Sequence, residues 1–390
     1  MKESQKIPKG YKKTELGVIP EDWNLKTVAD FGNIITGSTP STKIKEYWNG
    51  DIPWVTPTDI TVKKYIYCTK REITKDGLNK IRRLPLDSLL ITCIASIGKN
   101  TILKKEGACN QQINAIIPDK KFNIDFLYYV FEKAIKYLIG HAGITATNII
   151  SKQNFSNIRF AVPELKEQTK IGSVLSNIDS LIENLEKIIE KKKLIKQGAM
   201  QELLTGKKRL PGFSSRCEVK RLGELLYYEQ PTKYIVKNNE YSIRNIVPVL
   251  TAGKSFILGY TNEEHNIFRN LPVIIFDDFT TASQFVDFPF KVKSSAMKIL
   301  KPVDKYTDLR FVFCKMQLIN FKLGDHKRYW ISEYQNLKID IPNTVEQSAI
   351  ATVLSDMDAE IDKSEVELSK YKNIKQGMMQ NLLTGKIRLV

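Results

Sequence analysis

The chain has 390 residues, enough for two or three domains, and its 42% of hydrophobic residues can form buried cores. Its 60 Lys and Arg outnumber 43 Asp and Glu, so the net charge of +17 indicates an anionic partner. A run of about 18 apolar residues, as a membrane span requires, is absent, and the start of the chain lacks the apolar segment of a signal peptide. We therefore expect a cytoplasmic protein without a membrane partner.

Nucleic acid is the polyanion that remains, and Lys and Arg would bind it by releasing counterions from the phosphates. A basic protein that binds no nucleic acid is the alternative. The five cysteines are scattered, without a C-x-x-C pair or a histidine at ligand spacing, so neither a disulfide framework nor a zinc site is predicted. We expect reduced, mostly buried thiols.

The first part of the chain has the pattern of a domain that mixes strands and helices. Apolar runs bounded by turn residues predict strands in 88–98 and 114–118, and 126–138 predicts a helix. Loops around these elements, such as 41–59 and 109–112, combine cations, aromatic rings and amides. This combination is typical of surfaces that contact nucleic acid.

Amide and cationic side chains in these loops are the candidates for contact with DNA. Asn, Gln, Arg and Lys can read base edges in the major groove, and Lys also binds phosphate. The neighbouring Trp48 and Trp54 could stack on bases, although packing against a small sheet is the favoured interpretation. The candidate DNA contacts of this segment are Lys43, Lys45, Thr56, Lys99, Gln111 and Asn148.

A long helical pattern follows, between a proline at its start and a glycine at its end. Its apolar residues alternate at spacings of four and three, which predicts the seam of a coiled coil. A helix over 168–204 would be about 55 Å long at 1.5 Å per residue. A core helix of a bundle is the alternative, but the length and the lysine-rich outer face favour a coiled coil. The seam residues are Ile171, Leu175, Ile178, Ile182, Leu185 and Ile189.

The next globular segment has the same kind of composition and a different interior. Strands are predicted in 271–279 and 296–302, and polar loops again surround them. Its edges match those of the first segment, because 218–222 resembles 24–28 in sequence and 334–339 resembles 155–160. The candidate DNA contacts of this segment are Lys254, Thr281, Gln284, Lys327 and Arg328.

Motifs for catalysis are missing. Asp277 and Asp278 could ligate a metal in a nuclease, but no Glu-x-Lys follows at a useful distance, so a turn at a strand end is favoured. A phosphate-binding loop needs glycine five residues before Gly253, where this chain has Pro248. A dinucleotide fingerprint and the Asn/Asp-Pro-Pro-aromatic sequence of amino-methyltransferases are also absent. We predict a binding protein without catalytic residues, cofactor or metal of its own.

The chain ends on a copy of its first long helix. Residues 163–210 and 342–389 align without a gap, about half of the positions are identical, and KQGAMQELLTGKKRL recurs as KQGMMQNLLTGKIRL. Ser364 interrupts the second seam where Leu185 stands in the first. The simplest partner for such a narrow apolar seam is the seam of the other copy of the helix. The second seam consists of Ile350, Leu354, Met357, Ile361, Leu368 and Tyr371.

These observations predict an α+β protein with a pseudo-two-fold internal duplication. Two globular domains would be separated by two long helices that pack against each other as a coiled coil. The predicted division is 1–163 for the first globular domain, 164–210 for the first spacer helix, 211–342 for the second globular domain and 343–390 for the second spacer helix. Domains related in this way would present one face to two inverted DNA segments, as dimeric repressors do.

The order of these elements resembles the specificity subunit of type I restriction–modification systems. Similar phrases are LGVIPEDWNLKTV near the start and TGSTPSTKIKEYWNGDIPWVTPTDI in the first domain. The helix openings PELKEQTKIGSVLSNID and PNTVEQSAIATVLSDMD are similar as well. The likeness covers essentially the whole chain.

The resemblance implies a subunit without catalysis, whose two target-recognition domains each read one half of a bipartite target in double-stranded DNA. The helices would pack as an antiparallel coiled coil and fix the gap between the halves. It also implies two modification subunits, which carry S-adenosylmethionine and methylate adenine, and restriction–translocase subunits that cut unmethylated DNA. ATP and Mg are expected on those partners.

Two hypotheses of other classes stay open. A self-sufficient nuclease or methyltransferase would use Asp277 and Asp278 for its chemistry. A coiled-coil adaptor would keep the helices but bind no nucleic acid.

Overall fold

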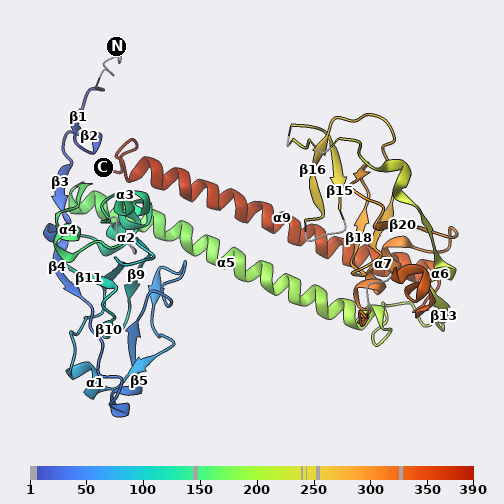
Figure 1. Ribbon diagram of the computed structural model, residues 1–390, viewed down its shortest axis with the longest axis horizontal. Helices are drawn as coiled ribbons and strands as arrows, with labels where there is room; N and C mark the ends of the chain where they lie inside the picture. Colours follow the sequence, from blue (N-terminus) through green and yellow to red (C-terminus); the bar gives the residue numbers. More distant parts are fainter. Residues whose placement is uncertain (1–6, 144–147, 239, 243, 252–254, 325–327) are drawn as a thin grey trace. The chain divides into compact units, whose positions relative to one another are not determined.

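Two compact units divide the chain, and each combines residues from distant parts of the sequence (Figure 1). The computed structural model describes residues 7–390 except 144–147, 239, 243, 252–254 and 325–327. The first unit comprises Met1–Glu186 and Glu367–Val390, and the second comprises Lys187–Val366. Each unit therefore contains one globular segment, the start of one long helix and the end of the other.

The first unit is built on a five-stranded sheet in the order β4-β11-β8-β9-β6, which α2 contacts. Its strands are β1 Tyr11–Thr14, β2 Gly17–Pro20, β3 Asn24–Thr27, β4 Gly32–Thr36, β5 Trp48–Val55, β6 Tyr65–Ile66, β7 Glu72–Ile73, β8 Ser88–Thr92, β9 Asn100–Leu103, β10 Ala108–Cys109, β11 Ile113–Pro118 and β12 Arg159–Val162. Its short helices are α1 Lys75–Asn79, α2 Ile124–Lys133, α3 Ile135–Gly140 and α4 Lys152–Asn157. The strands predicted in 88–98 and 114–118 are confirmed as β8 and β11.

A second, three-stranded sheet in the order β10-β5-β7 carries the two tryptophans of the first loop region. Trp48 and Trp54 pack edge to face with ring centroids 5.0 Å apart, and Trp54 is buried. The guanidinium of Arg71 lies 3.9 Å from the ring centre of Trp48. The packing interpretation therefore holds, because these faces already have partners.

The second unit has a four-stranded sheet in the order β14-β20-β17-β18 and a three-stranded sheet in the order β16-β15-β19. Its strands are β13 Glu218–Arg221, β14 Leu226–Glu229, β15 Val247–Leu250, β16 Ile257–Thr261, β17 Val273–Asp277, β18 Ser283–Val286, β19 Lys291–Val292, β20 Met297–Pro302 and β21 Lys338–Ile341. Its short helices are α6 Leu222–Leu225, α7 Leu309–Gln317 and α8 Tyr329–Ser332. The strands predicted in 271–279 and 296–302 are confirmed as β17 and β20.

The edges of the two globular segments are built alike, as their sequences predict. β3 pairs antiparallel with β12, and β13 pairs antiparallel with β21. The backbone N–H of Val28 donates to the carbonyl of Ile158, and that of Leu222 donates to the carbonyl of Leu337, both at 2.9 Å. Each segment is thus closed by a strand pair directly before a long helix.

The two long helices are α5 Leu165–Leu204 and α9 Thr344–Leu382. In the first unit Lys375 lies 2.9 Å from Asp179, and Lys372 lies 2.7 Å from Glu186. From the first pair to the second, the residue number rises on α5 and falls on α9, so the two helices run antiparallel in this unit. In the second unit Lys193 contacts Glu365 and Lys196 contacts Asp358, which gives the same direction. The predicted fold class is therefore confirmed.

The predicted seam residues lie mostly at buried positions of these helices. Those that are buried are Ile171, Leu175, Ile178, Ile182, Ile189, Ile350, Leu354 and Ile361. Those that are half-buried are Leu185, Met357, Leu368 and Tyr371. The interruption at Ser364 is itself buried, and Lys192 donates a hydrogen bond to its hydroxyl at 3.3 Å. A lysine head group thus occupies the place where the second seam loses its apolar residue.

A buried carboxylate near the start of each long helix binds an arginine beyond the end of the other. Glu167 accepts hydrogen bonds from Nε and Nη2 of Arg388 at 2.9 and 2.8 Å, and Arg388 also contacts Asp22 at 2.6 Å. Glu346 and Arg209 form the equivalent pair in the second unit. Burial raises the pKa of Glu167, but hydrogen bonds led by those of Arg388 outweigh it and hold the pKa below its usual value.

The first prediction concerns the helix seam. Ile182→Asp should lower the free energy of unfolding by about 2–4 kcal/mol, because it places a carboxylate where the side chain is almost fully buried and removes apolar contacts. Urea denaturation of the full chain followed by circular dichroism measures the change. The control Ser180→Asp, on the exposed face of the same helix turn, should shift stability by less than about 0.5 kcal/mol. Equal midpoints for both variants would contradict the buried seam.

The second prediction concerns the helix-end ion pair. Arg388→Ala should cost roughly 2–3 kcal/mol at pH 7, because it leaves Glu167 charged and buried without its main donor. Since the folded pKa of Glu167 lies below its unfolded value, the stabilisation is complete above about pH 5 and is lost as pH falls through the folded pKa. The deficit of the variant should therefore shrink in acid.

Denaturant titrations at several pH values measure this deficit. Arg159→Ala, which removes an exposed ion pair with Glu15, is the matched arginine control and should cost less than about 1 kcal/mol. A deficit of Arg388→Ala that does not depend on pH would contradict the role of the Glu167 charge.

Candidate functional site

Several loops of the first unit meet at one end of its five-stranded sheet. The pairs Ile113–Thr92 and Ile91–Asn100 place the end of β8 beside the starts of β11 and β9. β4 is antiparallel to β11, so it also ends there. Antiparallel pairing thus brings together the loop after β4, the β8–β9 turn and the turn before β11.

Three of the candidate DNA contacts lie at this end of the sheet, and all three are exposed. Lys99 lies in the β8–β9 turn and Gln111 lies just before β11. The carbonyl of Asn148 accepts a hydrogen bond from the backbone of Ala95, in the same turn as Lys99, at 3.0 Å. Thr39 donates to the amide oxygen of Gln111 at 2.6 Å, and the NH2 group and the second lone pair of that oxygen remain for other hydrogen bonds.

Thr56 also lies close to this end of the sheet, but its hydroxyl already donates a hydrogen bond to another side chain. It follows β5, whose last residue Val55 accepts a hydrogen bond from the backbone of Asn110 at 2.9 Å. The hydroxyl of Thr56 donates to Asp59 at 2.6 Å, and the backbone of Thr56 donates to the same carboxylate oxygen at 2.9 Å. In the structure Thr56 therefore stabilises a turn.

Lys43 and Lys45 are exposed but lie elsewhere along the three-stranded sheet. Both precede β5, whereas Thr56 follows its end. Their loop is held by Trp48, whose indole N–H donates to the carbonyl of Ser41 at 3.1 Å. The structure therefore does not bring these two lysines to the end of the sheet that carries Lys99 and Gln111.

In the second unit a buried aspartate brings two candidate segments together. The carbonyl of Asp278 accepts a hydrogen bond from the backbone of Tyr329, and its carboxylate accepts one from the backbone of Trp330, both at 2.9 Å. Arg328, just before these residues, is exposed, and Thr281 lies in the turn that follows Asp278. The β17–β18 turn and the start of α8 are thus held side by side.

The remaining candidates of the second unit are Gln284, Lys254 and Lys327. Gln284 is exposed on β18, which is the edge strand of its sheet. Lys254 and Lys327 lie outside the described residues.

The paired aspartates hold a turn and a helix start. One carboxylate oxygen of Asp277 accepts hydrogen bonds from the backbones of Phe279 and Thr280 at 2.9 and 3.3 Å. The carboxylate of Asp278 lies 3.5 Å from Nζ of Lys298, which is completely buried. No cluster of three His, Cys, Asp or Glu that could hold a metal occurs among the described residues. The hydrogen bonds of Asp277 and Asp278 favour the interpretation of a turn at a strand end.

Sequence reasoning missed a buried polar network that joins the first globular segment to α5. Lys64 lies 2.7 Å from Asp125 on α2 and donates to the hydroxyl of Ser176 on α5 at 2.6 Å. Tyr129 on α2 donates to Asp179 on α5 at 2.6 Å. Burial lowers the pKa of Lys64 and raises that of Tyr129. These bonds fix the orientation of the α2 face on the long helix.

The network continues to α9 through Lys375. Its Nζ lies 2.9 Å from Asp179 and 3.0 Å from Glu132 on α2. Burial raises the pKa of Glu132, and the ammonium of Lys375 opposes that effect. A signal was present in the sequence, because Asp179 and Lys375 recur in the repeat as Asp358 and Lys196.

The buried cysteines are poor nucleophiles in this environment. Burial raises the pKa of Cys93 and Cys109 to about 12 and that of Cys314 to about 11. Such thiols are protonated at neutral pH, and the thiolate is the reactive form. Cys68 is exposed and Cys217 is half-buried.

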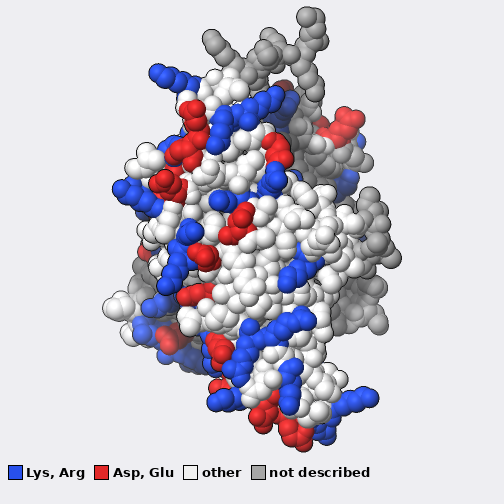
Figure 2. Space-filling view, turned by 90° about the vertical axis from the view of Figure 1, so that its left-hand side faces the viewer, with Lys and Arg blue, Asp and Glu red and all other residues white. Residues whose placement is uncertain are grey.

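Figure 2 shows Lys and Arg side chains interspersed with Asp and Glu around a broad uncharged area. On this face the positive side chains therefore form no continuous patch. Within the described residues, no helix has both the length and the apolar character that crossing a membrane requires.

Comparisons with known proteins agree on one family. Residues 20–193 match the family model described as the type I restriction modification DNA specificity domain. The chain is 56% identical over 126 residues to the specificity subunit of the type I restriction enzyme EcoR124I/EcoR124II of Escherichia coli, a match that spans 31% of each protein. It is 29% identical over an alignment of 426 residues to the specificity subunit of the type I restriction enzyme MjaIX of Methanocaldococcus jannaschii, which spans 97% of this chain and 96% of that relative.

A solved structure has the same fold. The crystal structure of the type I restriction–modification S subunit from M. genitalium matches with a TM-score of 0.63 at 15% identity, over 92% of this chain and 96% of the other. This likeness covers both β-rich domains and both long helices of the chain. Residues 20–193 thus resemble the DNA specificity domain of type I restriction modification, and over nearly its whole length the chain is similar to a type I restriction enzyme specificity subunit.

Proposed function

We propose that this protein reads a bipartite DNA sequence for a type I restriction–modification complex and performs no catalysis itself. Each globular domain binds one half of the target. The observation that carries the proposal is the duplication: matching strand pairs and matching helix-end ion pairs frame two β-rich domains with different interiors. The matching strand pairs and ion pairs would dock both domains in the same geometry. The different interiors would let each domain bind a different half-site.

The division of the chain follows from this role. Residues 1–163 and 211–342 act as the target-recognition domains, and 164–210 and 343–390 act as the spacer helices. The contact between Asp179 and Lys375 and that between Asp358 and Lys196 support the spacer role, because equivalent ion pairs hold the helices together in each unit. One helical turn more would displace a domain by about 5.4 Å.

The contacts with DNA are proposed to involve the exposed candidates first. Lys99, Gln111 and Asn148 share one end of a sheet in the first domain, and Arg328 lies beside the turn of Thr281 in the second. Lys43, Lys45 and Gln284 are exposed and serve as further phosphate or base contacts. Such side chains can bind phosphates or base edges in the grooves.

The partners follow from the same role. Two modification subunits dock on the helices and carry S-adenosylmethionine, and restriction–translocase subunits supply ATP- and Mg-dependent cleavage. The specificity subunit needs no cofactor for reading DNA, and it works in the cytoplasm, where its DNA target lies. The hydrogen bonds that already engage Asp277 and Asp278 support a role without catalysis.

The decisive experiment is a map of adenine methylation across the host genome, with and without this gene. The proposal predicts a bipartite methylated motif that disappears on deletion, and an unchanged methylome would contradict it. Purified protein that cleaves or methylates DNA with only metal or S-adenosylmethionine added would establish a self-sufficient enzyme instead. A complex with the modification subunit that is indifferent to DNA and salt would establish an adaptor.

A prediction at residue level concerns Lys99. In the assembled methyltransferase, Lys99→Ala should reduce the slope of log affinity against log salt by about 1, because one phosphate contact is lost. Lys105→Ala is the matched control, since Lys105 is an exposed lysine beyond the opposite end of β9. Fluorescence anisotropy over a salt series measures both. Equal salt slopes for the two variants would show that Lys99 does not contact the DNA phosphates.

The neighbouring amide tests base reading. Gln111→Ala should weaken binding of the cognate site by about 1–3 kcal/mol and relax the preference at one base pair, because an amide can make a bidentate contact with adenine. Competition with single-base variants of the methylated motif measures this. A uniform loss across all sequences would assign Gln111 to the DNA backbone.

A further inference from the structure

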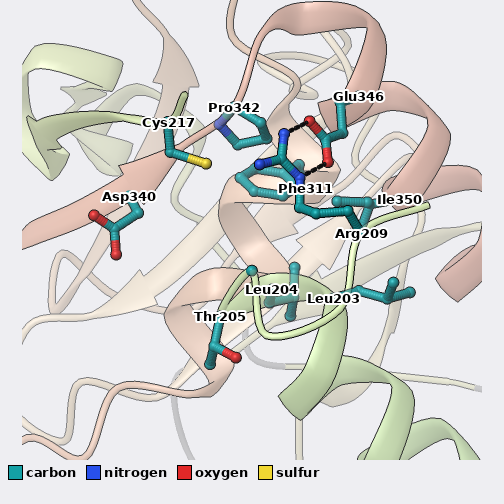
Figure 3. Close-up of a pocket in the computed structure, with 11 residues that line it drawn as sticks. Leu203, Leu204, Thr205, Arg209, Cys217, Phe311, Asp340, Pro342, Glu346 and Ile350 are labelled. Carbon is teal, nitrogen blue, oxygen red and sulfur yellow. Dashed lines mark hydrogen bonds and ion pairs between the residues drawn. The ribbon is translucent and has the colours of Figure 1, made fainter. Parts of the chain in front are cut away.

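The second unit contains a cavity of about 190 Å³ between the end of α5 and the start of α9 (Figure 3). α7 and β21 also contribute to its walls. In Figure 3 the labelled side chains surround a central space, and the Arg209–Glu346 ion pair forms part of its border. The lining residues that matter here are Leu204, Arg209, Cys217, Phe311, Glu346 and Ile350.

The duplication shows which side chain this place can accommodate. Trp23 directly precedes β3 and Cys217 directly precedes β13, and these strands pair with β12 and β21 in the same register. The two residues therefore occupy equivalent positions in the two units. The first unit has a large aromatic ring where the second has a small thiol.

Trp23 fills its position completely. Its side chain is fully buried, and its indole N–H donates to the carboxylate of Glu167 at 3.2 Å. A Cβ placed on Gly385 would clash with the Pro20 ring and lie 3.4 Å from the Trp23 ring, whereas one placed on the equivalent Gly206 would meet no described atom within 4 Å. The space beside Gly206 thus corresponds to a place that Pro20 and the edge of the Trp23 indole fill in the first unit.

The walls of the two sites match as well. Phe126 and Phe311 follow equivalent helix caps, because the backbone of each donates to its cap residue at 2.9 Å. Ile171 and Leu383 share the core of Trp23, and the equivalent residues Ile350 and Leu204 share the corresponding core of the second unit. An aromatic ring would therefore meet the same apolar side chains in both units.

The polar wall of the cavity also contains a hydrogen-bond acceptor. Glu346 is completely buried, and among the described residues Arg209 is the donor to both of its carboxylate oxygens. A carboxylate can accept about four hydrogen bonds. In the first unit Glu167 accepts from Arg388 and also from Trp23, so the equivalent carboxylate has capacity for an aromatic N–H.

We infer that this cavity is a binding site for a small planar aromatic molecule with an N–H donor, of which indole is the simplest example. The ring occupies the place that Trp23 fills in the first unit, and its N–H donates to Glu346. The volume suits such a ligand, because an apolar cavity of about 150 Å³ is enough to bind benzene. Cys217 is half-buried and lines the cavity, so a ligand there lies against its thiol.

The test is calorimetric titration of the full chain with indole. Wild-type protein should bind one equivalent, and Cys217→Trp should bind at least tenfold more weakly and melt at a higher temperature, because the introduced ring fills the cavity. Cys68→Trp, which alters an exposed cysteine, is the matched control and should bind like the wild type. Absence of binding to the wild type, or equal binding by Cys217→Trp, would overturn the inference.

A second measurement needs no variant. Indole should slow the alkylation of Cys217 by iodoacetamide severalfold and leave the alkylation of Cys68 unchanged, as followed by mass spectrometry of the peptides. Equal rates at Cys217 with and without indole would contradict the site. 1-Methylindole should bind several times more weakly than indole, and equal binding would overturn the proposed hydrogen bond to Glu346.

Discussion

The structure depends on two buried carboxylates, Glu167 and Glu346, which bind Arg388 and Arg209. Each pair ties the start of one long helix to the residues beyond the end of the other. A buried carboxylate without its donor is costly, so the pairs fix which residues of α5 and α9 can lie opposite each other. The same helix starts follow β12 and β21, whose pairing with β3 and β13 closes the globular segments. Register along the helices and closure of the domains are therefore coupled.

Within this repeated frame the two units differ where side chains meet the helices. In the first unit Tyr129 and Glu132 connect α2 to Asp179 and Lys375 through partly buried hydrogen bonds. The equivalent positions of α7, counted from its N-cap, carry Cys314 and Gln317, although the ion pair between Lys196 and Asp358 is kept. The exchange of Trp23 for Cys217 follows the same pattern. One chain with two copies can vary such contacts separately, which a symmetric homodimer cannot do.

Sequence patterns predicted the elements well and the exact burial less well. The helix expected over 126–138 is divided at Ala134 into α2 and α3, because apolar periodicity continues through a break that only backbone geometry reveals. Leu185 and Met357 belong to the seam but are half-buried, since a pair of helices covers each seam from one side. Among the candidate contacts, Lys99 and Gln111 come together, whereas Lys43 and Lys45 do not, because loop residues reveal their neighbours only once strand order is known.

The sequence by itself determined the duplication, the two long helices, the matching domain edges and the excess of positive charge, because these are repeats, periodicities and sums along the chain. The tertiary structure alone decided which end of the first sheet gathers Lys99, Gln111 and Asn148, that Asp278 is used to hold Tyr329 and Trp330, and that Cys217 lines a cavity whereas the equivalent Trp23 is fully buried. Those outcomes depend on contacts between residues far apart in the chain, and their free energy comes from burial and hydrogen bonding that no local pattern contains.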